Sequence, residues 1–181
     1  MIVNLIGLPA SGKSTFARWF TPRHPGTLYL AIDEVRKYFD STFPESDVLQ
    51  KELAAWEFIN AQIIDNEPPT PRFIILESTG LSPGIEQLWS NEKIGRPVYT
   101  VKLIVSQDTL LARAQQRATV DDDTCAIFLE AESFSLLPSN LAVTSDSLDI
   151  YSYRTIEMKI LAAELHHMWN NLKPIQEEQW K

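Results

Sequence analysis

A glycine-bounded stretch near the N-terminus carries the clearest chemical signal in the chain. Residues Gly7 to Ser14 read GLPASGKS and fit the spacing G-x-x-x-x-G-K-S. An apolar run over residues 2–6 precedes it, and the segment from Thr15 onward is typical of a helix. A strand, this loop and a helix in that order form the context that the spacing requires. The predicted phosphate-binding residues are Gly7, Leu8, Pro9, Ala10, Ser11, Gly12, Lys13, Ser14 and Thr15.

The residue types of this loop explain how it would hold phosphate. Gly7 and Gly12 let the backbone curl so that its N–H groups point at phosphate oxygens, and the helix that follows adds its positive dipole end. Lys13 supplies a cation for the outer phosphates, and Ser14 offers a hydroxyl to Mg²⁺. The alternative is a glycine turn that only links strand to helix, which the agreement of spacing and flanks disfavours.

Two further charged patterns follow predicted strands. Asp33 and Arg36 lie three residues apart at a helix start, so they are neighbours on one face. The carboxylate could take the proton of an acceptor hydroxyl, and the guanidinium could hold a phosphate or carboxylate. The alternative is an Asp helix cap beside a solvated Arg. Glu77, after the third strand, could contact magnesium through water, orient the acceptor, or only terminate the strand.

Arg113 and Arg117 lie four residues apart on the helix that follows the fourth predicted strand. Like charges at this spacing repel mildly, and a phosphate chain closing beneath them would relieve the repulsion. The alternative for this pair is a solvated helix face.

Composition limits the class of protein. The 181 residues, of which 44% are hydrophobic, predict one globular domain spanning 1–181. A formal net charge of −8 argues against a broad nucleic-acid-binding surface. Cys125 stands alone, which excludes an intramolecular disulfide framework. No leader or bilayer-length apolar run is visible, so we expect a cytoplasmic protein without membrane attachment.

Apolar runs alternate with helical patterns along the chain. We expect strands near residues 2–6, 27–32, 72–76, 98–105 and 141–144, separated by helices such as 46–65, 107–119 and 151–172. Helical spacing predicts an apolar stripe of Leu49, Leu53, Trp56 and Ile63 on the 46–65 helix and places Met168 of the last helix inward. This alternation predicts an α/β fold with a five-stranded, mostly parallel sheet flanked by helices. Ligands of such sheets bind beyond the carboxyl ends of the strands. We therefore expect one rim to carry Gly7, Asp33, Glu77 and Ser106.

The segments GLPASGKST, AIDEVRKYF and LESTG together resemble the small P-loop kinases. The resemblance is strongest to the branch with polynucleotide 5′-kinase domains, zeta toxins and related AAA-type ATP-binding proteins. It implies a three-layer P-loop NTPase kinase fold, with ATP and Mg²⁺ as cofactors. It also implies a D-x-x-R motif, in which Asp33 serves the acceptor hydroxyl and Arg36 is the arginine. QDTLLARAQQRATV resembles the start of the family's lid, so Arg113 and Arg117 are candidate lid cations. One departure is Glu77, where many relatives have Asp, and a second is a short lid, around residues 107–135.

The favoured interpretation is a kinase that transfers the γ-phosphoryl group of Mg-ATP to a hydroxyl. The catalytic candidates are Lys13, Asp33, Arg36, Arg113 and Arg117. The acceptor remains open between a polynucleotide 5′-hydroxyl and a small molecule, and the oligomeric state is open too. One alternative is a sugar-nucleotide or antibiotic phosphotransferase, and another is a module that binds or hydrolyses ATP without an acceptor.

Overall fold

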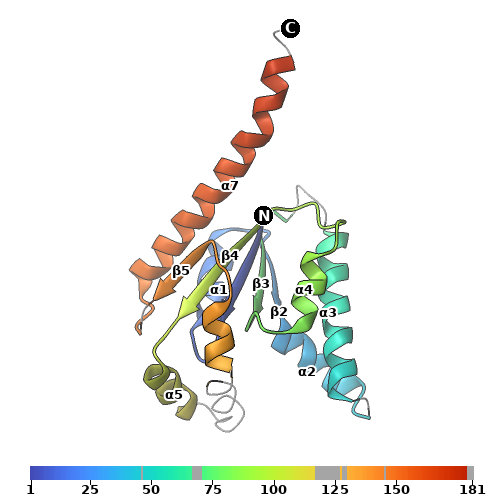
Figure 1. The fold of residues 1–181 in the computed structure, drawn as a ribbon, viewed down its shortest axis with the longest axis vertical. Helices are drawn as coiled ribbons and strands as arrows, with labels where there is room; N and C mark the ends of the chain where they lie inside the picture. Colours follow the sequence, from blue (N-terminus) through green and yellow to red (C-terminus); the bar gives the residue numbers. More distant parts are fainter. Residues whose placement is uncertain (46, 67–70, 117–126, 128–129, 145, 179–181) are drawn as a thin grey trace.

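In the computed structural model, the described residues are 1–45, 47–66, 71–116, 127, 130–144 and 146–178. Within them, five strands form one sheet, in which every neighbouring pair is parallel and the order is β2-β3-β1-β4-β5 (Figure 1). The strands are β1 (Ile2–Gly7), β2 (Leu28–Ala31), β3 (Ile74–Ser78), β4 (Val98–Ile104) and β5 (Leu141–Thr144). The expected five-stranded parallel sheet is therefore confirmed.

The central strand β1 explains the apolar run at the start of the sequence. All six of its residues are buried, because β1 pairs with β3 on one side and with β4 on the other and helices cover both faces. A strand in this position reads as a continuous hydrophobic run rather than an alternating one. Gly7 ends the strand, so the glycine-bounded loop starts at the centre of the sheet's carboxyl edge.

Short polar signals set the helix boundaries. Asp47 caps one helix by accepting from the Gln50 amide at 2.9 Å, and Ser82 and Ser106 cap two others. The helices are α1 (Lys13–Phe20), η1 (Thr21–Arg23), α2 (Ile32–Thr42), α3 (Val48–Asp65), α4 (Pro83–Trp89), α5 (Gln107–Gln115) and α7 (Ile150–Glu178). Residues 130–136 are helical as well.

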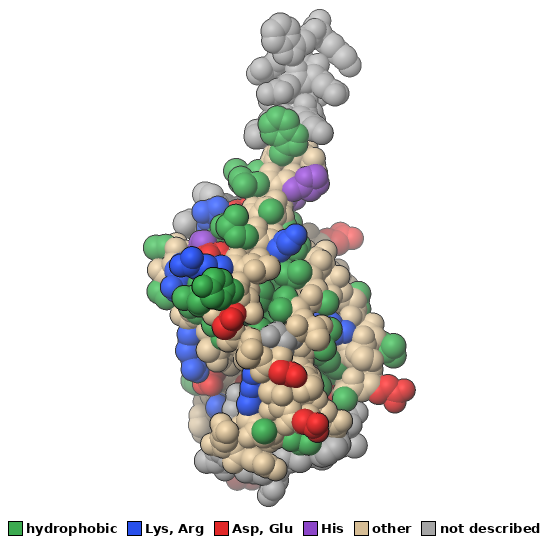
Figure 2. Space-filling view, turned by 90° about the vertical axis from the view of Figure 1, so that its left-hand side faces the viewer, with side chains coloured by type: hydrophobic (Ala, Val, Ile, Leu, Met, Phe, Trp, Pro, Cys, Tyr) green, Lys and Arg blue, Asp and Glu red, His purple; other side chains and the backbone are tan. Residues whose placement is uncertain are grey.

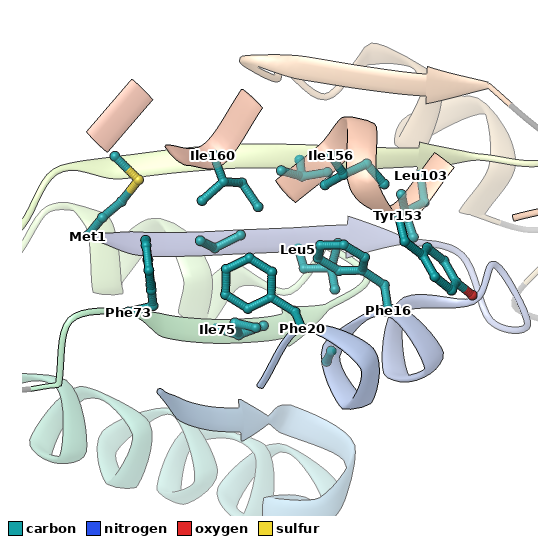
Figure 3. Close-up of a cluster of buried hydrophobic side chains, with 13 residues drawn as sticks. Met1, Leu5, Phe16, Phe20, Phe73, Ile75, Leu103, Tyr153, Ile156 and Ile160 are labelled. Carbon is teal, nitrogen blue, oxygen red and sulfur yellow. The ribbon is translucent and has the colours of Figure 1, made fainter. Parts of the chain in front are cut away.

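The helices form layers on the two faces of the sheet. On one face, Phe16 and Phe20 of α1 pack with Ile156 and Ile160 of α7 against the strands (Figure 3). On the other face, Trp56 and other residues of α3, together with α4, pack on the alternate side chains of β3. A third cluster joins the start of the loop after β1 to α5 and residues 130–136. The loop is thus enclosed by packed elements.

Two expectations about helix faces were wrong. The sequence pattern placed Leu49 and Leu53 of α3 in the core, but they are 64% and 42% exposed, whereas Trp56 and Ile63 are buried as expected. Helical spacing identifies a face but does not say how far along the helix the core extends. The helix α3 also packs beside α2, and Lys51 near its start pairs with Asp40 of α2.

The last helix, α7, was expected to end before Pro174, but it continues to Glu178. A proline removes one backbone donor, and near a helix end this disturbs few hydrogen bonds. Figure 1 shows the later part of α7 projecting away from the sheet. Met168, expected to face inward, is 52% exposed there, and Figure 2 shows apolar side chains on this projection. None of the described helices is long and apolar enough to cross a bilayer.

Candidate nucleotide and acceptor site

The loop after β1 has a tight backbone that depends on its two glycines. Gly12 has φ of 95°, a left-handed conformation that side chains disfavour. A Cβ on Gly7 would lie 2.4 Å from the Ser11 Oγ. Within the loop, the Ser11 amide donates to the Leu8 carbonyl at 3.1 Å and closes a tight turn. The loop then enters α1 at Lys13, so the helix N-terminus and the loop amides belong to one concave backbone segment.

Lys13 lies inside this segment. Its Nζ donates to the carbonyls of Gly7 at 2.7 Å and Leu8 at 3.1 Å, and the side chain is buried. A buried ammonium group beside backbone amides forms a strongly positive centre, which favours an anion with several charges such as a polyphosphate.

Ser14 is joined to Glu77 on the neighbouring strand. The Ser14 hydroxyl donates to Glu77 Oε1 at 2.7 Å, and the Tyr29 hydroxyl donates to Glu77 Oε2. Burial, together with the hydrogen bond to Glu77 and its negative charge, raises the pKa of Tyr29, so the phenol keeps its proton and remains a donor. Sequence reasoning did not find Tyr29. The nearness of Tyr29 to Glu77 becomes visible only in the register of the two strands. That register pairs Tyr29 with Ile75, which lies two residues before Glu77 on the same face of β3.

The Ser14–Glu77 pair fits a magnesium ion. Both groups are hard oxygen donors, and a hydroxyl that donates its proton to a carboxylate still has lone pairs for a cation. The part of the chain that the structure describes contains no group of three His, Cys, Asp or Glu side chains that could hold a metal. The protein would therefore supply one or two contacts, with phosphate and water supplying the others, as is usual for Mg²⁺ at nucleotides.

Asp33 and Arg36 lie in the first turns of α2, next to the carboxyl end of β2. The helix is capped at Ala31 without a side-chain hydrogen bond, so Asp33 is not the cap residue that the alternative interpretation required. The Asp33 carboxylate instead accepts from the Arg36 guanidinium at 2.5 Å. The two side chains are 59% and 43% exposed, and an ion pair this open contributes at most about 1 kcal/mol to stability. Both groups are therefore accessible to an acceptor.

Glu130 lies within electrostatic reach of this pair and of the loop lysine. Burial raises its pKa, Asp33 and Glu52 act in the same direction, and Arg36 and Lys13 oppose it. Its Oε2 is buried and has no hydrogen-bond partner among the described residues. The structure thus brings Lys13, Asp33 and Arg36 into the neighbourhood of one carboxylate. No motif in the sequence pointed to Glu130, because its position depends on the packing of residues 130–136 over the site.

We expect Glu130→Gln to stabilise the protein in a pH-dependent way. Because the pKa of Glu130 is raised by folding, its ionised form costs stability at neutral pH, and this cost disappears where both the folded and unfolded states are protonated. The variant should melt at a higher temperature than the wild type at about pH 7.5, and the difference should vanish near about pH 3. Thermal denaturation across pH measures this, with Glu132→Gln, an exposed neighbour, as control. Equal melting temperatures at pH 7.5 would contradict it.

Arg113 lies on the opposite side of the loop. Its guanidinium donates to the Ala10 carbonyl at 3.1 Å and to the Asp146 carbonyl at 2.5 Å. It therefore joins the loop to the segment that follows β5. Arg117, the other candidate lid cation, lies outside the described residues, as does much of the predicted lid around 107–135. Arg113 thus lies beside the loop in the structure, and its role as a lid cation stays a prediction.

We expect Arg113→Ala to weaken nucleotide binding. Without the guanidinium, the loop at Ala10 and the segment at Asp146 lose their shared donor, and a hydrogen bond from a charged group is worth about 1.5–3 kcal/mol. The dissociation constant for Mg-ATP should rise about tenfold or more, as measured by calorimetry. Arg154→Ala, at an exposed position on α7, serves as control. Unchanged nucleotide affinity, with loss of turnover alone, would instead assign Arg113 to the transferring phosphate.

The central strand, its loop and the all-parallel sheet together define a P-loop NTPase fold of the kind found in small kinases. The family is shown by the sequence itself. Residues 2–131 match the model of AAA_33, described as an AAA domain, and the chain belongs to this family. No curated protein matches the chain.

Solved structures share this fold at low sequence identity. A shikimate kinase from Aquifex aeolicus vf5 is 17% identical, with a TM-score of 0.56 over 91% of this chain and 99% of that chain. A gluconokinase from Sinorhizobium meliloti 1021 is 15% identical, with a TM-score of 0.59 over 94% of each chain. A shikimate kinase from Bacteroides thetaiotaomicron is 14% identical, with a TM-score of 0.54 over 96% of this chain and 98% of that chain. The narrower resemblance to polynucleotide 5′-kinases and zeta toxins stays a prediction.

Proposed function

We propose that the protein is an ATP-dependent kinase that transfers the γ-phosphoryl group of Mg-ATP to a hydroxyl acceptor. The observation that carries this proposal is the arrangement around the loop: Lys13 is buried against the loop carbonyls, and Ser14 is bonded to Glu77. The fold shared with shikimate kinases and gluconokinases supports it. Mg²⁺, held on the protein side by Ser14 and Glu77, would neutralise charge on the phosphates.

The residues of the chain have distinct parts in the proposed transfer. The loop amides and Lys13 hold the phosphates and stabilise charge on the transferring group. The hydroxyl oxygen of the acceptor bonds to the γ-phosphorus, and Asp33 accepts the proton that this hydroxyl loses. The bond from that phosphorus to the bridging oxygen breaks, and ADP leaves. Arg36 orients Asp33 through their hydrogen bond. Phosphoryl transfer has a loose transition state, so positioning and charge account for most of the rate.

We further propose that the acceptor is a small hydroxylated molecule rather than a polynucleotide end. The chain carries a formal net charge of −8. On the acceptor side, Arg36 is accompanied by the carboxylates of Asp33, Glu52 and Glu130. A nucleic-acid site needs a surplus of Lys and Arg against the phosphate backbone. Whether this small molecule is a sugar nucleotide, an antibiotic or another alcohol is tested by the acceptor screen.

A transfer screen with γ-³²P-labelled ATP tests the proposal. The candidates are small polyols and alcohols, nucleosides, sugar nucleotides, aminoglycoside-type antibiotics and 5′-hydroxyl oligonucleotides. We expect label to move to a small-molecule class and not to the oligonucleotides. Labelled oligonucleotide would overturn the acceptor class while leaving the kinase activity standing. Release of labelled phosphate without transfer to any class would favour the ATP-hydrolysing module instead.

A further inference from the structure

The contact between Tyr29 and Glu77 is an unusual feature of the metal side of the site. Glu77 is buried near the carboxyl end of β3, with one carboxylate oxygen bonded to Ser14 and the other to Tyr29. A Glu side chain has three rotatable bonds, so a single contact to Ser14 would leave its carboxylate several orientations. The second contact removes that freedom. Tyr29 comes from β2, on the side of β3 away from the loop strand.

We infer that Tyr29 is a positioning residue, whose hydroxyl fixes the Glu77 carboxylate so that the Ser14–Glu77 pair binds the divalent cation of the nucleotide. This inference rests on the proposed function, since it assigns a role at the same nucleotide site. Tyr29 acts mainly through Glu77, because its hydroxyl donates to that carboxylate, and the Ser14 hydroxyl also lies close to the phenol. Ser14 keeps its proton directed at Glu77 and its lone pairs available for the cation. Tyr29 thereby affects the metal contact without touching nucleotide.

The chain offers a matched control. Tyr99 on β4 is a half-buried strand tyrosine that packs against the same hydrophobic cluster as Tyr29. Its hydroxyl has no hydrogen bond to any residue that the structure describes. Tyr29→Phe and Tyr99→Phe therefore remove the same atom from similar surroundings, and only the first removes a bond to Glu77. Glu77→Gln, which keeps the size of the side chain and removes its charge, provides the reference for complete loss of the carboxylate.

The experiment measures binding of the non-hydrolysable analogue AMP-PNP by calorimetry, once with Mg²⁺ and once with EDTA. The ratio of the two affinities reports the metal contact separately from the fold. We expect Tyr29→Phe to lower this ratio about tenfold relative to the wild type, with binding in EDTA unchanged, since a hydrogen bond to a charged group is worth about 1.5–3 kcal/mol. Tyr99→Phe should keep the wild-type ratio. Glu77→Gln should lower it at least as much, and adding Tyr29→Phe to Glu77→Gln should change it little further.

Three outcomes would overturn the inference. Wild-type affinity of Tyr29→Phe in both conditions would show that Glu77 does not need the phenol. Equal losses with and without Mg²⁺ would assign Tyr29 a structural role only, and so would a Tyr99→Phe effect of the same size. If the wild type binds AMP-PNP in neither condition, the proposed function itself fails, and the failure is recognised before any variant is compared.

Discussion

Lys13→Met should abolish phosphoryl transfer while the protein stays folded. The side chain of Lys13 is the cation within the loop, and its buried Nζ lies against the Gly7 and Leu8 carbonyls. Methionine keeps the length of the side chain and removes the charge, so the transition state loses a fixed positive group in a site of low dielectric. We expect kcat/KM to fall at least about a thousandfold, which corresponds to a loss of about 4 kcal/mol of transition-state stabilisation.

Lys102→Met is a closely matched control for Lys13→Met. Lys102 is also a buried lysine, and its Nζ donates to the carbonyls of Ser135 at 2.9 Å and Leu137 at 3.0 Å. Both variants remove a buried ammonium group that satisfies two backbone carbonyls, so both should lose some stability. Only Lys13→Met should lose transfer. If the Lys13 variant retained full activity, the loop would not be the phosphate site and the proposed function would be wrong.

Asp33→Asn should leave the fold and nucleotide binding intact and reduce turnover strongly. Asn has nearly the shape of Asp but cannot take the proton of an acceptor hydroxyl. General-base assistance contributes about 10²–10⁴-fold, so kcat should fall by about two orders of magnitude or more. The Arg36–Asp33 pair is largely exposed and contributes at most about 1 kcal/mol, so the melting temperature should change little. Steady-state kinetics with the acceptor identified by the screen measures the effect.

The same helix supplies the control for Asp33→Asn. Asp40 lies near the other end of α2, is 61% exposed, and pairs with Lys51 at 3.3 Å. Asp40→Asn removes an equally exposed, ion-paired carboxylate away from the site and should leave kcat unchanged. Normal turnover of Asp33→Asn with the acceptor would exclude Asp33 as the base. Glu130 would then be the next candidate for the catalytic carboxylate, because Glu77 is already bonded to Ser14 and Tyr29.

The sequence predicted those features that depend on residues close together in the chain. The GLPASGKS spacing located the loop, and the apolar run before it predicted a strand that is buried on both faces. Alternation of strands and helices predicted the parallel sheet, since each crossover is a local unit. The sequence also placed Glu77 at the same edge of the sheet as the loop, and in the structure Glu77 accepts a hydrogen bond from Ser14.

The features that sequence reasoning missed depend on pairing between distant segments. Tyr29 is an ordinary strand residue until the register of β2 and β3 places it diagonally opposite Glu77. Glu130 belongs to no motif, and its raised pKa follows from its burial and from the charges that surround it in the folded protein. Leu49 and Leu53 show the opposite error, since a correct helical period was extended beyond the part of α3 that the sheet covers.

The strand order has a consequence for how proteins of this architecture can diverge. The loop strand β1 lies in the middle, with β3 and β2 on one side and β4 and β5 on the other. Asp33 and Arg36 follow β2 on the first side, whereas Arg113 and Asp146 follow β4 and β5 on the second. If Asp33 and Arg36 face the acceptor, as proposed, substitutions in α2 can change the acceptor while the loop after β1, Arg113 and the contacts among Tyr29, Glu77 and Ser14 are retained. New specificities can then arise from duplicated genes without the intermediate ancestors losing the residues that would hold the nucleotide.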